Sequence, residues 1–349
     1  MLTQTVAGRT WDFSHVVGRT AEYGAGFRDP CAVTIGQGDV VYVLNRGSEM
    51  TFDVPWNQMV VGARISKLTI GTVVGDEELV SEVSRYGDAP GEYIWGAGIA
   101  VDTQGNLYLT DEWLNKVSIF DKEDNFLSRW GGSGEGDGQF NGPSGIVTDQ
   151  QDNLYVVDSR NHRVQKLTKE GAFLSKWGRF GSGEGEFASP WGITIDGEGY
   201  VYVADHKNHR VQKFAPEGRF VAVFGSYGDG RGQLNHPTSV AVDPDGEVYV
   251  CDWANNRVQV FGPDGRFITS LIGEAQELSK WANTALEANS DAIKARRRAY
   301  TREPEWRFDV PMGLAFDAGK GRLVVVDTAR RRLQIYNKLK GYSVPQITV

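Results

Sequence analysis

The stretch NLYVVDSRNHRVQKL, residues 153–167, decides the fold because its pattern returns at a constant interval. It recurs as NLYLTDEWLNKVSIF from residue 106, as YVYVADHKNHRVQKF from residue 200 and as EVYVCDWANNRVQVF from residue 247. The aspartates of the four copies lie 47 residues apart, at Asp111, Asp158, Asp205 and Asp252. A fixed interval of this length is typical of a chain built from structural repeats.

Two further copies are less regular. PMGLAFDAGKGRLVVVDTARRRLQIY places Asp327 after a long insertion, and PCAVTIGQGDVVYVLN has Asn45 where the other copies have the aspartate. Each copy reads as four short strands, which are two alternating apolar runs, the RVQKF-like run and a run such as FLSRW. A four-stranded unit repeated around an axis is a propeller blade. Six copies therefore predict an all-β, six-bladed β-propeller.

The N-terminal segment predicts how the ring closes. FSHVVGRTAEYGAGF, residues 13–27, matches FLSRWGGSGEGDGQF, residues 126–140, and so reads as a fourth strand without a blade in front of it. We expect it to pair with the last blade, which removes the open sheet edges. Residues 1–349 then form a single domain.

Two insertions interrupt the repeat. One lies between Asn45 and Arg64, and the other, at about residues 273–307, contains ELSKWANTALEANSDAIKARRRAY. The second is rich in helix formers and has apolar residues at helical spacing, which predicts a helical insertion between blades 5 and 6. Both belong to loops of one face, and we interpret the helical one as a lid beside the channel mouth or, alternatively, as a solvated decoration or dimer contact.

The units resemble NHL repeats. The pattern G-x-G-x-x-x-x-P-x-G-I-A-V-D followed by Y-V-x-D-x-x-N-x-R-V-Q-x-F is matched nearly throughout from Gly131 to Phe261. The resemblance implies the propeller fold but leaves function open, because such propellers include RNA-binding modules, protein-binding modules and the peptidyl-hydroxyglycine amidating lyase.

Composition and net charge restrict the partners and the location that we expect for the protein. The net charge of −8 argues against a polyanionic partner, and no run of 18 apolar residues could span a membrane. The start MLTQTVAGRT does not resemble a signal peptide, and two cysteines make no disulfide framework. We therefore expect a cytoplasmic protein without membrane contact.

The repeated Asp and the Arg five positions later are interpreted as structural, because a group present in nearly every blade cannot define one asymmetric site. The site is expected where the repeat varies, in the loops around the channel mouth. As catalytic candidates we single out His206, His236, Asp29 and Glu112. As substrate-binding candidates we single out Arg46, Trp95, Trp191, Trp253 and Cys31, with Arg46 holding an anionic group and the tryptophans forming apolar walls. An inert, semi-buried thiol is the alternative for Cys31.

No metal or cofactor is predicted. In the amidating lyase the resemblance places zinc-binding histidines just after the blade proline, where this chain has Cys31, Ala97, Ser144, Trp191, Thr238 and Met312. We expect a small-molecule enzyme, lyase- or hydrolase-like and metal-independent, or a binder, using the central funnel. The alternative is an NHL-type protein-interaction platform, and RNA binding is less favoured because the basic run KARRRAYTR, residues 294–302, is local.

Overall fold

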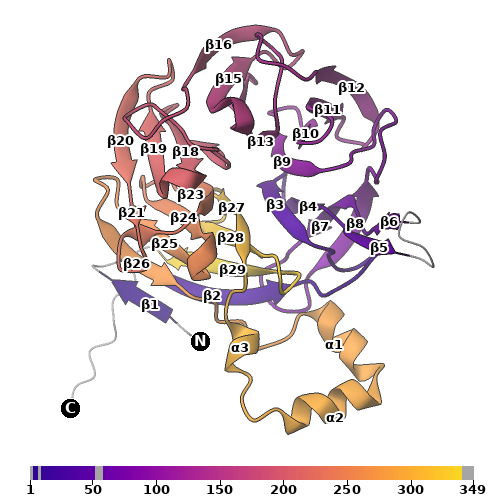
Figure 1. The fold of residues 1–349 in the computed structure, drawn as a ribbon. Helices are drawn as coiled ribbons and strands as arrows, with labels where there is room; N and C mark the ends of the chain where they lie inside the picture. Colours follow the sequence, from indigo (N-terminus) through magenta and orange to yellow (C-terminus); the bar gives the residue numbers. More distant parts are fainter. Residues whose placement is uncertain (1–2, 7–8, 52–57, 340–349) are drawn as a thin grey trace.

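Six β-sheets stand as blades around a central axis (Figure 1). The computed structural model describes residues 3–6, 9–51 and 58–339. The first strand of each blade is innermost and contacts the first strands of the neighbouring blades. The predicted six-bladed β-propeller is confirmed.

The blades follow the repeat along the chain. Blades 1 to 3 consist of β3 (Pro30–Ile35), β4 (Val40–Asn45), β7 (Arg64–Thr69) and β8 (Glu78–Val83); β9 (Gly96–Val101), β10 (Leu107–Asp111), β11 (Lys116–Phe120) and β12 (Phe126–Gly131); and β13 (Pro143–Thr148), β14 (Leu154–Asp158), β15 (Arg163–Leu167) and β16 (Phe173–Trp177). Blades 4 to 6 consist of β17 (Ile193–Ile195), β18 (Val201–Asp205), β19 (Arg210–Phe214) and β20 (Phe220–Phe224); β23 (Pro237–Val242), β24 (Val248–Asp252), β25 (Arg257–Phe261) and β26 (Phe267–Leu271); and β27 (Pro311–Asp317), β28 (Arg322–Asp327), β29 (Arg332–Leu339) and β2 (Arg9–Val17).

Shorter elements decorate the blades. They are β1 (Thr3–Val6), the hairpin β5 (Ser48–Thr51) and β6 (Gln58–Val61), the pair β21 (Ser226–Tyr227) and β22 (Gln233–Leu234), the 3₁₀ turns η1 (Ser159–Asn161), η2 (His206–Asn208) and η3 (Trp253–Asn255), and the helices α1 (Lys280–Glu287), α2 (Ser290–Arg298) and α3 (Glu303–Trp306).

The N-terminal strand closes the ring as predicted. β2 pairs antiparallel with β29, from Thr10 opposite Leu339 to Val17 opposite Leu333. Trp11 on β2 is buried, and its Nε1 donates a hydrogen bond of 3.0 Å to the Tyr249 hydroxyl of blade 5. β1 then pairs with the outer edge of β2 as a fifth strand, which the repeat did not indicate.

The repeated aspartate is structural, as its periodicity indicated. In blade 3, Asp158 is fully buried and accepts a hydrogen bond from the backbone N–H of Asn141 in the preceding loop. Its other oxygen accepts from Arg163 Nε at 2.7 Å, and the same arginine donates to the carbonyl of Gln139. The pair thus fixes the loop that enters the blade to the loop that leaves its second strand.

The loops braced in this way share one face of the ring, which we call the upper face. Both insertions start from it, but Figure 1 shows β5, β6 and the three helices at its outer edge. The helices pack against the ring closure, where Trp281 contacts Phe27 with ring centroids 6.3 Å apart and Ser279 Oγ donates to the Gly18 carbonyl at 2.6 Å. The expectation of a lid over the channel is therefore wrong.

No helix in the described ranges combines the length and apolar character needed to cross a membrane.

Replacing Trp11 with alanine tests the closure. The change removes a buried indole and its hydrogen bond, so we expect the free energy of unfolding to fall by about 3–5 kcal/mol in denaturant titrations. The matched control is Trp113→Ala, because the Trp113 side chain is 69% exposed. The control should shift stability by less than about 0.5 kcal/mol. Equal effects of the two substitutions would show that β2 does not hold the ring together.

Candidate functional site

Side chains from opposite sides of the ring meet over the upper mouth of the channel. The Arg46 guanidinium, from the end of β4 in blade 1, lies between two indoles, with Cζ 5.2 Å from the ring centroid of Trp95 and 5.5 Å from that of Trp191. Its Nε donates to the Gly96 carbonyl at 2.9 Å. Trp191 enters from blade 4, so the contact spans the mouth. The space directly below is a narrow cavity of about 60 Å³.

Trp191 is held in place through its backbone. Its carbonyl accepts hydrogen bonds from Ser144 Oγ at 2.9 Å and from the Gly145 N–H at 2.8 Å. A Cβ at position 145 would lie 2.6 Å from this carbonyl oxygen, so the close approach requires glycine there. The first strand of blade 3 therefore fixes the loop that carries Trp191.

A cavity of about 360 Å³ opens beside this stack. Its lining residues come from blades 1 to 4 and are Arg46, Trp95, Glu112, Trp113, Arg160 and Trp191. Glu112 accepts a hydrogen bond from Arg160 at 2.8 Å, while its Oε2 lies 3.6 Å from Arg46 Nη2. Neither of these last two atoms has a hydrogen-bond partner among the described residues, although both are buried. A polar ligand group that lies beside both atoms could accept from the donor and donate to the acceptor.

On the other side, Trp191 contacts a histidine. His206, the first residue of η2, has its ring centroid 5.9 Å from that of Trp191, 4.9 Å from His236 and 6.2 Å from Trp253. Burial lowers the pKa of His206 to about 4. Its Nδ1 lies 3.2 Å from the Pro237 carbonyl, which can only accept, so Nδ1 carries the proton and the lone pair is on Nε2. His206 is thus a neutral base at neutral pH.

The sequence comparisons identify the repeat. The NHL repeat model matches residues 140–167, 187–214 and 234–261, which lie in blades 3, 4 and 5. This chain is a β-propeller that contains NHL repeats. No curated protein sequence matches it.

Solved structures share the fold of the NHL propeller. Virginiamycin B lyase from Staphylococcus aureus, solved as a catalytically inactive variant with quinupristin, has a TM-score of 0.52 and 12% identity, covering 94% of this chain and 88% of that chain. An auxiliary nutrient binding protein from Bacteroides thetaiotaomicron has a TM-score of 0.61 and 13% identity, covering 95% of this chain and 77% of that chain. At these identities the likeness concerns the fold alone.

The predicted residues of this propeller fall into two groups that share Trp191. Arg46, Trp95 and Glu112 line the cavity, whereas the two histidines and Trp253 pack together beyond Trp191. Glu112 is engaged by Arg46 and Arg160 and not by either histidine.

Two candidates do not line the cavity of about 360 Å³. Asp29 lies at the junction of blades 6 and 1, where it accepts a hydrogen bond from Ser48 and pairs with Arg331 at 3.4 Å. Cys31 is buried beneath the stack, and its thiol lies 3.6 Å from the Leu44 carbonyl. Burial raises the pKa of this thiol, which favours the inert reading over substrate binding.

The sequence analysis missed residues of the NHL propeller that complete the site. Trp113 and Arg160 stand two positions after the blade aspartate, whereas the analysis considered the first position after it. His209 was not among the candidates, although its ring lies 4.4 Å from that of His236 and 4.5 Å from that of Tyr227 by centroid. A comparison of the residues at the second position after each aspartate would have singled out Trp113 and Arg160.

Histidine also joins neighbouring blades. His162 Nδ1 accepts the backbone N–H of Ser189, and His209 Nδ1 accepts that of His236, both at 3.1 Å. The equivalent acceptors in other blades are the side-chain oxygens of Asn115 and Asn256. Burial lowers the pKa of both His162 and His209, as expected for rings that must stay neutral to accept.

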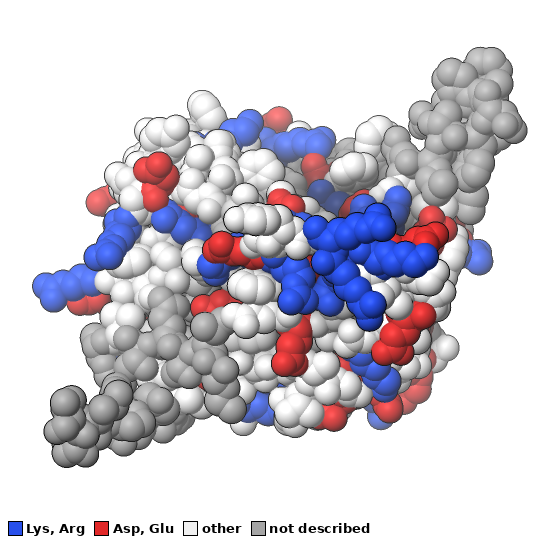
Figure 2. Space-filling view, turned by 90° about the horizontal axis from the view of Figure 1, so that it is seen from below, with Lys and Arg blue, Asp and Glu red and all other residues white. Residues whose placement is uncertain are grey.

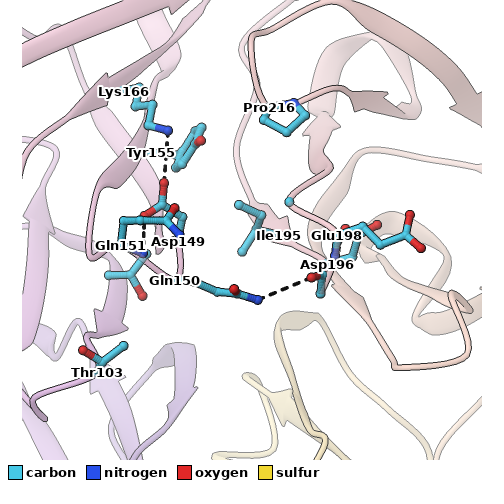
Figure 3. A pocket seen from close by; sticks show the side chains of 13 residues that line it. Thr103, Asp149, Gln150, Gln151, Tyr155, Lys166, Ile195, Asp196, Glu198 and Pro216 are labelled. Carbon is cyan, nitrogen blue, oxygen red and sulfur yellow. Dashed lines mark hydrogen bonds and ion pairs between the residues drawn. The ribbon is translucent and has the colours of Figure 1, made fainter.

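A second cavity, of about 400 Å³, lies at the opposite end of the strands, between blades 3 and 4 (Figure 3). Its buried charges pair with each other, with Lys166 3.0 Å from Asp149 and 4.7 Å from the Tyr155 ring centroid. Gln150 spans its floor and donates to the Gly197 carbonyl. Because these groups are engaged, the upper cavity is the stronger candidate site.

Within the part of the chain that the structure describes, no group of three or more His, Cys, Asp or Glu side chains has an arrangement suited to a metal ion.

Replacing both His162 and His209 with asparagine should reduce the acid sensitivity of the fold. A histidine whose pKa is lowered by folding contributes stability above its unfolded pKa of about 6.5 and loses it as pH falls through the folded value. Asparagine supplies the same acceptor without titrating. We expect the drop in melting temperature from about pH 7 to about pH 5 to be smaller in the double variant. An identical drop in both proteins would exclude the inter-blade role.

Proposed function

We propose that this protein binds a flat small molecule with a polar head in the cavity beside Arg46, and acts on it through proton transfer to His206, as a metal-independent lyase or hydrolase does. The observation that carries the proposal is the shared position of Trp191. Its indole walls the cavity and also contacts the ring of the neutral base. His206 does not line the cavity, so a ligand held by Arg46 extends past the edge of the Trp191 indole to reach the imidazole.

The cavity supports the binding half of the proposal. Three indoles offer flat apolar walls. The Nη2 of Arg46 lies 3.6 Å from Glu112 but donates no hydrogen bond to a described residue, so it can donate one to a carboxylate or carbonyl oxygen. Arg160 is 60% exposed at the rim and adds a second cation. The site therefore favours an anionic aromatic molecule.

His206 supports the catalytic half. In a lyase step its Nε2 takes a proton from a carbon beside a carbonyl, and the electrons of the C–H bond move toward the carbonyl to form an enolate. That electron pair then forms the new double bond as the leaving group departs with its own bonding pair. The negative charge that develops on the oxygen is stabilised by a guanidinium such as that of Arg46. A base of pKa about 4 stays unprotonated over the physiological range.

The structural neighbours are consistent with this class. One is named as a lyase solved with quinupristin, and another is named as a nutrient binding protein. Propellers of similar shape therefore include proteins that bind small molecules.

A protein-interaction platform is the second candidate. Large aromatic side chains stand exposed on loops of the upper face, with Trp113 69%, Phe180 71% and Tyr227 67% exposed. Exposed aromatic rings of this kind are enriched in protein interfaces. Such a surface would bind a protein whether or not Arg46 and His206 are intact.

Phenylpyruvate is a suitable probe of the binding half because it is flat, aromatic and carries a carboxylate. We expect calorimetry to show that it binds about tenfold more tightly than its methyl ester, since the ester lacks the charge that Arg46 recognises. Arg46→Met should abolish this preference, whereas Arg231→Met, an exposed arginine elsewhere, should retain it. Equal binding of acid and ester to the unmodified protein would refute the anion site.

The catalytic half is tested on the same compound, whose methylene protons are acidic. The protein should accelerate exchange of these protons with deuterium from D₂O, followed by NMR. His206→Gln should slow the exchange by about a hundredfold with unchanged affinity, while His162→Gln serves as the control. Because the active form is the neutral ring, the rate should hold as the pH is lowered and decline only near the pKa of about 4. Binding without exchange would make the protein a binder and not an enzyme.

A further inference from the structure

The helical insertion contains one helix, α2, that contributes no fully buried residue to the described fold. Its ends are anchored: Trp281 of α1 is buried against the ring closure, and the carbonyl of Trp306 in α3 accepts a hydrogen bond from the Ala275 N–H. Between these anchors, α2 has no buried residue in the described chain. Ala292, Ile293 and Arg296 are partly buried, and the other residues of α2 are exposed.

The helix α2 and the residues that follow it are strongly basic. Residues 291–302 contain five Lys or Arg and one Asp, although the whole chain has a net charge of −8. Figure 2, seen from below, shows Lys and Arg side chains gathered into one patch on this face, with Asp and Glu side chains beside it. Arg297, Arg298 and Arg302 are exposed, and none of the three side chains forms an ion pair or hydrogen bond with a residue that the structure describes. One cation at a helix C-terminus is enough to complement the helix dipole, at about 0.3–1 kcal/mol, so the cluster exceeds that need.

A cavity of mixed character lies within the patch. It measures about 440 Å³, and its lining combines Leu286 of α1, Ile293 of α2 and Ala299 with three arginines, Arg296, Arg297 and Arg302. Arg296 is committed to Glu305 at 3.4 Å, so the other two remain for a ligand. The cavity thus places two large apolar side chains next to two arginines that form no ion pair with a described residue.

We propose that this surface, formed by α1, α2 and the loop to α3, docks an acidic peptide segment of a partner protein. An apolar side chain of the segment fills the space between Leu286 and Ile293, and flanking carboxylates pair with Arg297, Arg298 and Arg302. Carboxylate and guanidinium match in charge and in bidentate geometry. A short segment suits the patch because a long polyanion would also meet the acidic remainder of the protein. The apolar side chains of Leu286 and Ile293 favour a peptide over nucleic acid, since phosphates and ribose have no apolar group to pack against them.

The test uses the full chain and a fluorescein-labelled decapeptide of Glu and Asp with a central leucine. Fluorescence anisotropy should detect micromolar binding that weakens as salt is raised. Replacing Arg297, Arg298 and Arg302 together with glutamate should lower affinity by about tenfold or more. Since α2 is not buried, the variant should keep the melting temperature of the parent. A peptide with serine in place of leucine should also bind about tenfold more weakly.

A matched control separates a local site from general electrostatics. The substitutions Arg219→Glu, Arg231→Glu and Arg266→Glu change net charge by the same amount at exposed positions on other blades. This control should bind the peptide like the parent. The proposal is overturned if the control loses as much affinity as the patch variant, if the serine peptide binds equally well, or if a labelled oligouridylate of similar length binds more tightly than the peptide at the same arginines.

Discussion

A buried carboxylate in five of the six blades organises the upper face of this propeller. An aspartate at the end of the second strand, as at Asp158, receives the N–H of the loop entering the blade and the guanidinium of the third strand. Burying a charge is costly unless it is paired and hydrogen-bonded, and here every such aspartate is held by several donors. Blade 1 replaces it with Asn45, whose amide oxygen still accepts the Arg28 N–H. The loops are therefore fixed in the same geometry even where the repeat has diverged.

This constraint explains how a symmetric scaffold carries an asymmetric site. The residues that immediately follow the braced position are free to vary, and they project toward the channel mouth. At successive blades they include Arg46, Glu112, His206 and Trp253. The backbone of Trp191 is held separately, by hydrogen bonds from blade 3. The result is one cationic and one imidazole group on either side of a single indole.

The positions of the insertions have a different physical cause. Their apolar residues pack where the ring closes, because the loop before Phe27 and the outer strand β2 leave apolar surface uncovered there. That packing removes the helices from the channel and presents α2 to solvent. The sequence indicated helices and the correct loop, but the direction of an insertion depends on which surface it can bury. The spacing of apolar residues along the chain does not indicate which surface that is.

Repeat spacing was sufficient to predict six blades, the closing strand and the structural role of the aspartates, because each of these follows from local patterns that recur along the chain. It also placed Arg46, Trp95, Trp191 and the two histidines around one mouth. The tertiary structure decided which of them touch. It separated Asp29 from the site, buried Cys31 beneath it, added Trp113 and Arg160, and set the neutral state of His206. Side-chain contacts across a ring and the burial that shifts a pKa depend on distances between blades, which a linear repeat does not specify.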